Sequence, residues 1–243
     1  MITLHDLLSN MTYGEFSQLS LGNFLPDEHE NEPNPKSYKQ LTSHVNLGLT
    51  ALYSEFVLVL EEIYIQLDEA ITTYVLSFDY AVSNTASPID LADRYIVDTA
   101  EIPFNDNVLK VEEIYDDFGN RLFTNDDTED LSIMTPTYRT LQVPWPNAWN
   151  VIAVQYRANH KRVSVTSATD LTSIEIFVPP QLEEALMFYV ASRVFASLPG
   201  NADSSESNDY FRKYQSKIQE VRHQGLYTQP ESGSWRFGDN GWV

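Results

Sequence analysis

The sequence predicts a mixed α+β protein in which a helical bundle is interrupted by a mostly antiparallel β domain. Apolar residues recur at helical spacing within residues 1–56 and again within 179–226. The stretch between them, 57–178, is rich in alternating, β-branched and aromatic residues typical of strands. We therefore expect one discontinuous antiparallel helical bundle with an inserted β domain, followed by an extended C-terminal tail over 227–243.

The N-terminal part predicts two helices separated by a loop. Residues 3 to 20 carry apolar side chains at helical spacing, and Thr3 is the expected N-cap. Residues 22 to 37 collect prolines, acids and amides, a composition that predicts an exposed loop. A second helix is expected over residues 37 to 56. The apolar residues that share one of its faces are Leu41, Val45, Leu49, Leu52 and Phe56.

Strands are expected from Val57 onward, where apolar and polar residues begin to alternate. Residues 108 to 123 predict a hairpin, because strand-like segments flank a turn in which Gly119 or Asn120 can adopt positive φ. Further strands are expected over residues 151 to 156 and 174 to 178.

Two helices are expected in the C-terminal part. Pro179 and Pro180 end the last strand, and the following helix ends near Pro199 and Gly200. A fourth helix is expected to begin at Asp203, Ser204 or Ser205 and to run to Gly225. The expected packing residues of this helix pair are Leu182, Leu186, Tyr189, Arg193, Tyr210, Phe211 and Tyr214.

The charge and composition exclude several classes of function. The chain carries 35 acidic and 15 basic side chains, a net charge of −20, which repels bare nucleic acid and anionic membranes. It contains no cysteine, which excludes disulfides and thiolate metal sites. The N-terminus lacks the pattern of a signal peptide, and glutamates interrupt the most apolar stretch, so no membrane span is expected.

No motif for catalysis or for a cofactor stands out. The sequence has no G-x-S-x-G or Gly-rich phosphate loop, and its five histidines lack metal-ligand spacing. The acidic run from 125 to 130 is expected to be a solvated loop, because it lacks the order of a calcium loop. Two adjacent pairs of acids could supply a carboxylate pair for acid–base chemistry: Glu61 with Glu62, and Glu112 with Glu113. Because adjacent residues of a strand point to opposite faces, we expect these acids instead to face outward and to serve solubility. We therefore expect no enzyme activity, no cofactor and no metal site.

The C-terminal tail combines large aromatic residues, an arginine and flexible glycines. Because aromatic residues and arginine are common anchors of interfaces, the tail is a candidate for insertion into a partner protein. The alternative, that Trp235 and Phe237 fold back onto their own bundle, remains open. The candidate docking residues are Trp235, Arg236, Phe237, Trp242 and Val243.

Three segments of the chain, together with the order of its elements, are similar to those of a known family. The segments are residues 179–195 (PPQLEEALMFYVASRVF), the charged helix at 208–219 (NDYFRKYQSKIQ) and the ending WRFGDNGWV. In these parts the chain resembles the head-to-tail adaptor proteins of tailed bacteriophages, of the tail tubular protein A type. The resemblance implies a virion protein, made in the host cytoplasm, that forms a ring of twelve copies beneath the portal. It also implies that the tail docks into the portal, while tail nozzle, tail tube or fibre proteins bind elsewhere.

The charge agrees with such a ring, because an acidic channel would let genomic DNA pass without binding it. Two other classes stay open. One is another neck, tail or baseplate connector, which would share the bundle-plus-β plan. The other is a carbohydrate-binding module, favoured by the aromatic content and by Trp145 and Trp149 near prolines.

Overall fold

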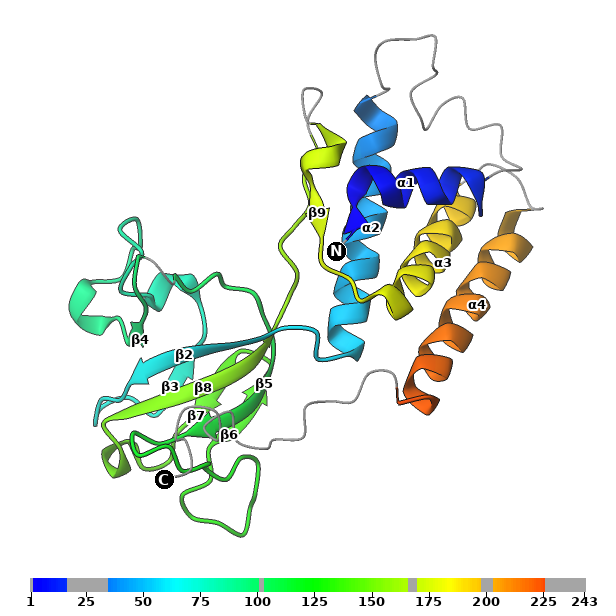
Figure 1. Cartoon of the computed structure of the whole chain (residues 1–243). Coiled ribbons are helices and arrows are strands. Elements are labelled where there is room, and N and C mark those ends of the chain that lie inside the picture. Colours follow the sequence, from blue (N-terminus) through cyan, green and yellow to red (C-terminus); the bar gives the residue numbers. More distant parts are fainter. Residues whose placement is uncertain (1, 17–34, 101–102, 166–169, 198–202, 226–243) are drawn as a thin grey trace, which may run out of the picture. The chain divides into compact units, whose positions relative to one another are not determined.

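The structure is a computed structural model that describes residues 2–16, 35–100, 103–165, 170–197 and 203–225 (Figure 1). It confirms a mixed α+β fold with four α-helices and antiparallel sheets in these residues. The chain divides into two compact units, one made of residues 1–56 and 161–243 and the other of residues 57–160. We describe each unit by itself.

The first unit contains the helices and one short pair of strands. Thr3 caps the first helix as expected, since its Oγ1 accepts a hydrogen bond from the Asp6 N–H at 3.1 Å. This helix ends at Tyr13, earlier than residue 20, because the chain turns at Gly14. The elements are β1 (Ile2–Thr3), α1 (Leu4–Tyr13), α2 (Pro35–Glu55), β9 (Glu175–Ile176), α3 (Pro180–Ser197) and α4 (Asp203–His223).

Helix α3 packs against the other helices of this unit (Figure 1). The α2 face expected from the sequence is buried, including Leu41, Val45 and Leu49. Gly48 lets α2 and α3 approach closely, because a Cβ at this position would lie 2.7 Å from Cδ1 of Leu186. Helix α3, from the C-terminal part of the chain, therefore packs directly on α2, from the N-terminal part.

The second unit contains two antiparallel sheets. The four-stranded sheet has the order β4-β2-β8-β5 and the three-stranded sheet the order β3-β7-β6. Their strands are β2 (Leu60–Gln66), β3 (Thr73–Val75), β4 (Ile96–Val97), β5 (Val108–Tyr115), β6 (Met134–Thr137), β7 (Thr140–Gln142) and β8 (Val151–Ala158). Side chains from both sheets share one buried core; Ile63 and Ile65 face it from β2, as the predicted alternation requires.

The predicted hairpin over 108–123 is present only in part. Gly119 has φ +85° in the expected turn. On the returning side, however, Arg121 forms only an isolated bridge with Tyr115, whereas β5 pairs along most of its length with β8.

The predicted last strand and the end of the β domain also differ from the structure. Strand β9 pairs with β1, so it belongs to the helical unit, and the β unit ends at residue 160 instead of 178. Side-chain hydrogen bonds hold the returning segment on α2. The Asn46 amide group donates to the Val163 carbonyl at 2.8 Å and accepts from its N–H at 2.9 Å, and the Tyr53 hydroxyl donates to the Phe177 carbonyl.

No helix within the described residues is long and apolar enough to cross a membrane.

Candidate functional site

A groove on the surface of the helical unit brings together four of the seven predicted packing residues. Tyr189 and Arg193 of α3 and Phe211 and Tyr214 of α4 line a hollow of about 490 Å³. We call it the aromatic groove; its other lining residues are Ala51, Ser192, Ala196, Ser207 and Asn208. The other three predicted packing residues do not line this groove.

The three remaining predicted residues stabilise the unit itself. Leu182 and Leu186 are fully buried in its core. Tyr210 stacks on Phe195 with ring centroids 5.1 Å apart. Stacking of this kind fixes how α4 lies on α3 and so positions the groove.

The rings of the aromatic groove contact one another in sequence. Tyr214 meets Tyr189 edge-on at a centroid distance of 5.2 Å and lies 5.8 Å from Phe211. Phe211 keeps 41% of its surface exposed, although it is a large apolar residue. The guanidinium of Arg193 lies over the Tyr189 ring at 5.6 Å, within the range of a cation–π interaction.

The electrostatics of the groove depend on one cation. Arg193 is the single charged residue among those that line it. Burial, followed by the nearby charge of Glu55, raises the pKa of Tyr214 to about 12, so its hydroxyl is neutral at physiological pH. Burial and then the positive charge of Arg193 lower the pKa of His44 on α2. The lining of the groove thus offers one cation within a strongly acidic chain.

The smaller residues that line the groove were not predicted as site residues. Ser207 of α4 donates a hydrogen bond to the Ser192 carbonyl of α3 at 2.9 Å, which joins the two helices. A signal for Ala51 was present in the sequence, because Gly48 and Ala51 place two small residues one turn apart on α2. Such spacing favours close approach of a neighbouring helix.

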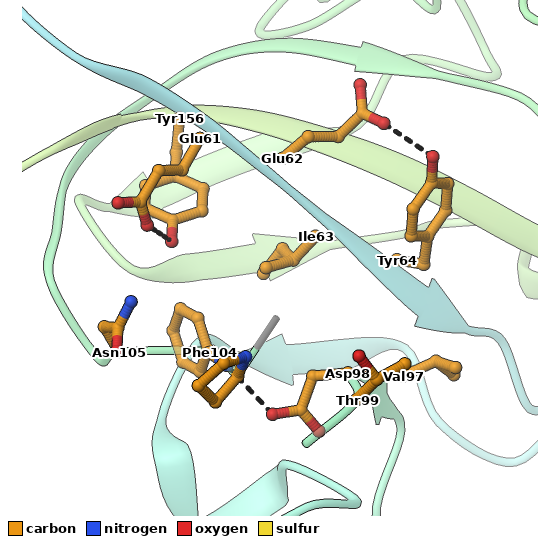
Figure 2. Close-up of a pocket in the computed structure, with 11 residues that line it drawn as sticks. Glu61, Glu62, Ile63, Tyr64, Val97, Asp98, Thr99, Phe104, Asn105 and Tyr156 are labelled. Carbon is orange, nitrogen blue, oxygen red and sulfur yellow. Dashed lines mark hydrogen bonds between the residues drawn. The ribbon is translucent and has the colours of Figure 1, made fainter. Parts of the chain in front are cut away.

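A second hollow, of about 430 Å³, lies in the β unit (Figure 2). Strand β2 contributes Glu61 and Glu62 to its wall, and the segment after β4 contributes Asp98. We call it the acidic pocket. Figure 2 shows the Glu61 carboxylate facing the Tyr156 hydroxyl, which donates to it at 2.7 Å, and the Tyr64 hydroxyl donating to Glu62 at the same distance.

The carboxylates of the acidic pocket have structural partners. Asp98 accepts hydrogen bonds from the Ser83 N–H at 2.8 Å and from the Phe104 N–H at 2.9 Å. Burial alone would raise the pKa of Asp98, but these hydrogen bonds, with the one from the Ser83 hydroxyl, lower it. Burial and the hydrogen bond to Glu61 raise the pKa of Tyr156. These acids thus order the loops around the pocket.

The expectation that Glu112 and Glu113 face outward is wrong. Glu112 is paired with Arg157 of β8, and Glu113, 8% exposed, accepts hydrogen bonds from Tyr115 and pairs with Arg121 at 3.2 Å. A register shift between Val111 and Glu113 marks an irregularity in β5 at this point. Such irregularities redirect side chains from the faces that simple alternation predicts.

The candidate docking residues of the tail lie outside the described residues. They are Trp235, Arg236, Phe237, Trp242 and Val243. Of the two tryptophans proposed for carbohydrate binding, Trp149 packs against the core of the β unit and Trp145 is 59% exposed. Trp145 is therefore the more exposed of the two.

The sequence matches no protein-family model and no curated protein. The fold and the groove define the chain as a mixed α+β protein with two compact units and an exposed aromatic surface on one helix pair.

Proposed function

We propose that the chain is a non-enzymatic virion protein, a head-to-tail adaptor of a tailed bacteriophage. In this proposal twelve copies form a ring beneath the portal that lines the exit channel for DNA. The C-terminal tail docks to the portal, and tail nozzle, tail tube or fibre proteins bind on the other side. The four helices form one bundle into which the β unit is inserted.

The aromatic groove is the observation that carries this proposal. Tyrosine, phenylalanine and arginine are typical of interfaces between proteins, and Phe211 is too exposed to contribute fully to the core of its own unit. The groove lies on the helix pair that resembles the adaptor family in sequence. A contact surface on this pair supports an assembly role.

The net charge of −20 supports the channel part of the proposal. A ring multiplies this charge around its axis, and like charge keeps phosphates from adhering to the wall. Screening restricts the repulsion to about 8–10 Å from the surface at physiological salt. A channel of this kind guides DNA without binding it.

Light scattering of the purified full-length chain, alone and mixed with its cognate portal protein, tests the proposal. The same measurement on a chain that ends before Tyr227 tests the role of the tail. The expected result is a ring, or a monomer that assembles on the portal and loses this ability without the tail. A monomer that ignores the portal in both forms would contradict the proposal.

Stoichiometry separates the adaptor from another neck, tail or baseplate connector. A copy number that differs from that of the portal-bound ring would favour such a connector. The exposed Trp145 favours a carbohydrate-binding module as a second class of function. Glycan-array binding by the full-length chain that disappears in Trp145→Ala would support that class.

A further inference from the structure

The aromatic groove contains a cation without a carboxylate partner. Within the described residues Arg193 forms no ion pair, and its contact is the face of Tyr189. Five other arginines each pair with a carboxylate of their own copy: Arg121, Arg139, Arg157, Arg212 and Arg222. Arg94 and Arg162 also form no ion pair within the described residues, and Arg94 donates to the carbonyls of Ile89 and Asn84 instead. Arg193 differs from both because it lines a hollow together with exposed aromatic surface.

The surroundings of Arg193 prepare it to receive an anion. The Tyr189 ring supports one face of the guanidinium, and the ring of Tyr214 supports Tyr189 in turn. Arginine presents its donors in a fixed planar fork that matches a carboxylate. The exposed ring of Phe211 provides apolar surface beside it for the stem of an incoming side chain. Such a lining fits an acidic residue with apolar neighbours.

We infer that the aromatic groove receives an acidic side chain of a second copy of this chain, which pairs with Arg193. This inference rests on the proposed function, in which copies associate side by side. Charge complementarity selects the occupant: a second copy has a net charge of −20, so its surface is rich in carboxylates and poor in cations. The groove offers such a surface a cation.

The contact is heterologous in this inference, because the groove of one copy meets a different, acidic patch of the next. Heterologous contacts generate closed rings when their rotation closes. One such groove in each copy is enough to join every neighbouring pair in a ring.

The test compares two charge reversals in the full-length chain. Arg193→Glu places a negative charge in the groove. Arg212→Glu is the matched control, because Arg212 also belongs to this helix pair, is highly exposed, pairs at 3.5 Å with Asp209 and does not line the groove. Both substitutions change the net charge by the same amount. Circular-dichroism melting curves check that both variants fold.

Sedimentation velocity over a range of protein concentrations measures association of the copies, alone and with the cognate portal. We expect Arg193→Glu to weaken association between copies by about tenfold or more, as for close interfacial charge pairs. We expect Arg212→Glu to remain within about twofold of the unchanged chain, as for exposed charges. Raised salt should weaken association of the unchanged chain and have less effect on Arg193→Glu.

Equal association of the unchanged chain and Arg193→Glu would overturn the inference, and so would equal loss in both variants. Copies that never associate, alone or on the portal, would overturn it as well. Single copies could instead bind the portal and lose this binding in Arg193→Glu. That result would show that the portal, and not a second copy, occupies the groove. If copies associate through Arg193 but ignore the portal, the adaptor proposal fails and the inference stands.

Discussion

Arg157 contacts a single oxygen of Glu112 through two of its nitrogens. Its Nε and Nη2 lie 2.9 Å and 2.6 Å from Oε1 of the carboxylate. The Arg157 side chain is 7% exposed and that of Glu112 20% exposed, so the pair is largely removed from water. It joins the central strand β8 to the edge strand β5.

Replacement of Glu112 by glutamine should destabilise the β unit. The change removes the carboxylate that pairs with the buried guanidinium of Arg157. Loss of one partner of a buried pair costs about 3–5 kcal/mol. Because Glu112 is partly exposed, we expect the lower end of this range. Urea denaturation followed by tryptophan fluorescence measures the loss.

Lys110→Gln is the control for Glu112→Gln. Lys110 also pairs with Glu112, at 3.1 Å, but its side chain is 63% exposed. An exposed pair of this kind contributes about 0–1 kcal/mol. Equal losses in both variants would show that burial of Arg157 does not determine the energy of the pair.

The sequence predicted those features that depend on local periodicity. The buried face of α2, the alternation along β2 and the Thr3 cap follow from residue spacing alone. The Glu112–Arg157 pair could not be predicted in this way, because it depends on a strand neighbour 45 residues away and on a register shift in β5. The attachment of the segment after β8 to Asn46 is likewise a contact between distant residues.

The aromatic groove was likewise predicted only in part, because residue spacing identifies its members but not how they gather. Helical spacing identified Tyr189, Arg193, Phe211 and Tyr214 as candidates. Spacing could not show that they gather around one hollow while Leu182 and Leu186 are buried, because that depends on how α3 and α4 pack. Sequence patterns identify the face of a helix, and packing decides which part of that face reaches solvent.

Gly48→Ala should destabilise the helical unit, although alanine favours a helix by about 1 kcal/mol over glycine. The added methyl group would lie 2.7 Å from Leu186 Cδ1 and 3.0 Å from Tyr189 Cδ1. Leu186 is fully buried and the tyrosine ring is stiff, so the added methyl group must displace these side chains or move the helices apart. Overpacking of this kind costs about 1–3 kcal/mol. We expect a net loss of about 1 kcal/mol in thermal or urea unfolding.

Ser43→Ala is the matched control for Gly48→Ala, because it also introduces alanine into α2 but at an exposed position. We expect this variant to be unchanged or slightly more stable. A gain in stability for Gly48→Ala would contradict the close approach of α2 and α3. Since Tyr189 lines the aromatic groove, Gly48→Ala should also weaken any association that uses the groove.

Gly119→Ala should destabilise the turn after β5. Gly119 has φ +85°, a conformation that alanine adopts only with strain. The turn is otherwise fixed by Asp116, whose carboxylate accepts from the N–H groups of Phe118 at 3.0 Å and Asn120 at 2.7 Å. We expect a loss of about 1 kcal/mol in urea unfolding. Asp117→Ala, in the same turn, should change stability by less than about 0.5 kcal/mol, and an equal loss there would contradict the prediction.

His44 should make the stability of the helical unit depend on pH. Within the described residues both of its ring nitrogens are buried without a hydrogen-bond partner. Burial and then the positive charge of Arg193 lower its pKa from the ordinary value of 6.5. The unfolded chain therefore binds a proton before the folded chain does. Stability is fully present above pH 6.5 and is lost as pH falls through the lowered pKa of the folded state.

The His44 prediction is tested by urea unfolding at a series of pH values between 7.5 and 5, above the range in which most carboxylates titrate. Replacement by leucine removes the titrating group, so the decrease in the free energy of unfolding across this range should become smaller. His5→Leu is the control, because the His5 side chain is 56% exposed and lies against Asp6. If the two variants and the unchanged chain show the same dependence on pH, another group is responsible. A smaller decrease in His44→Leu alone assigns the effect to the imidazole buried beside Arg193.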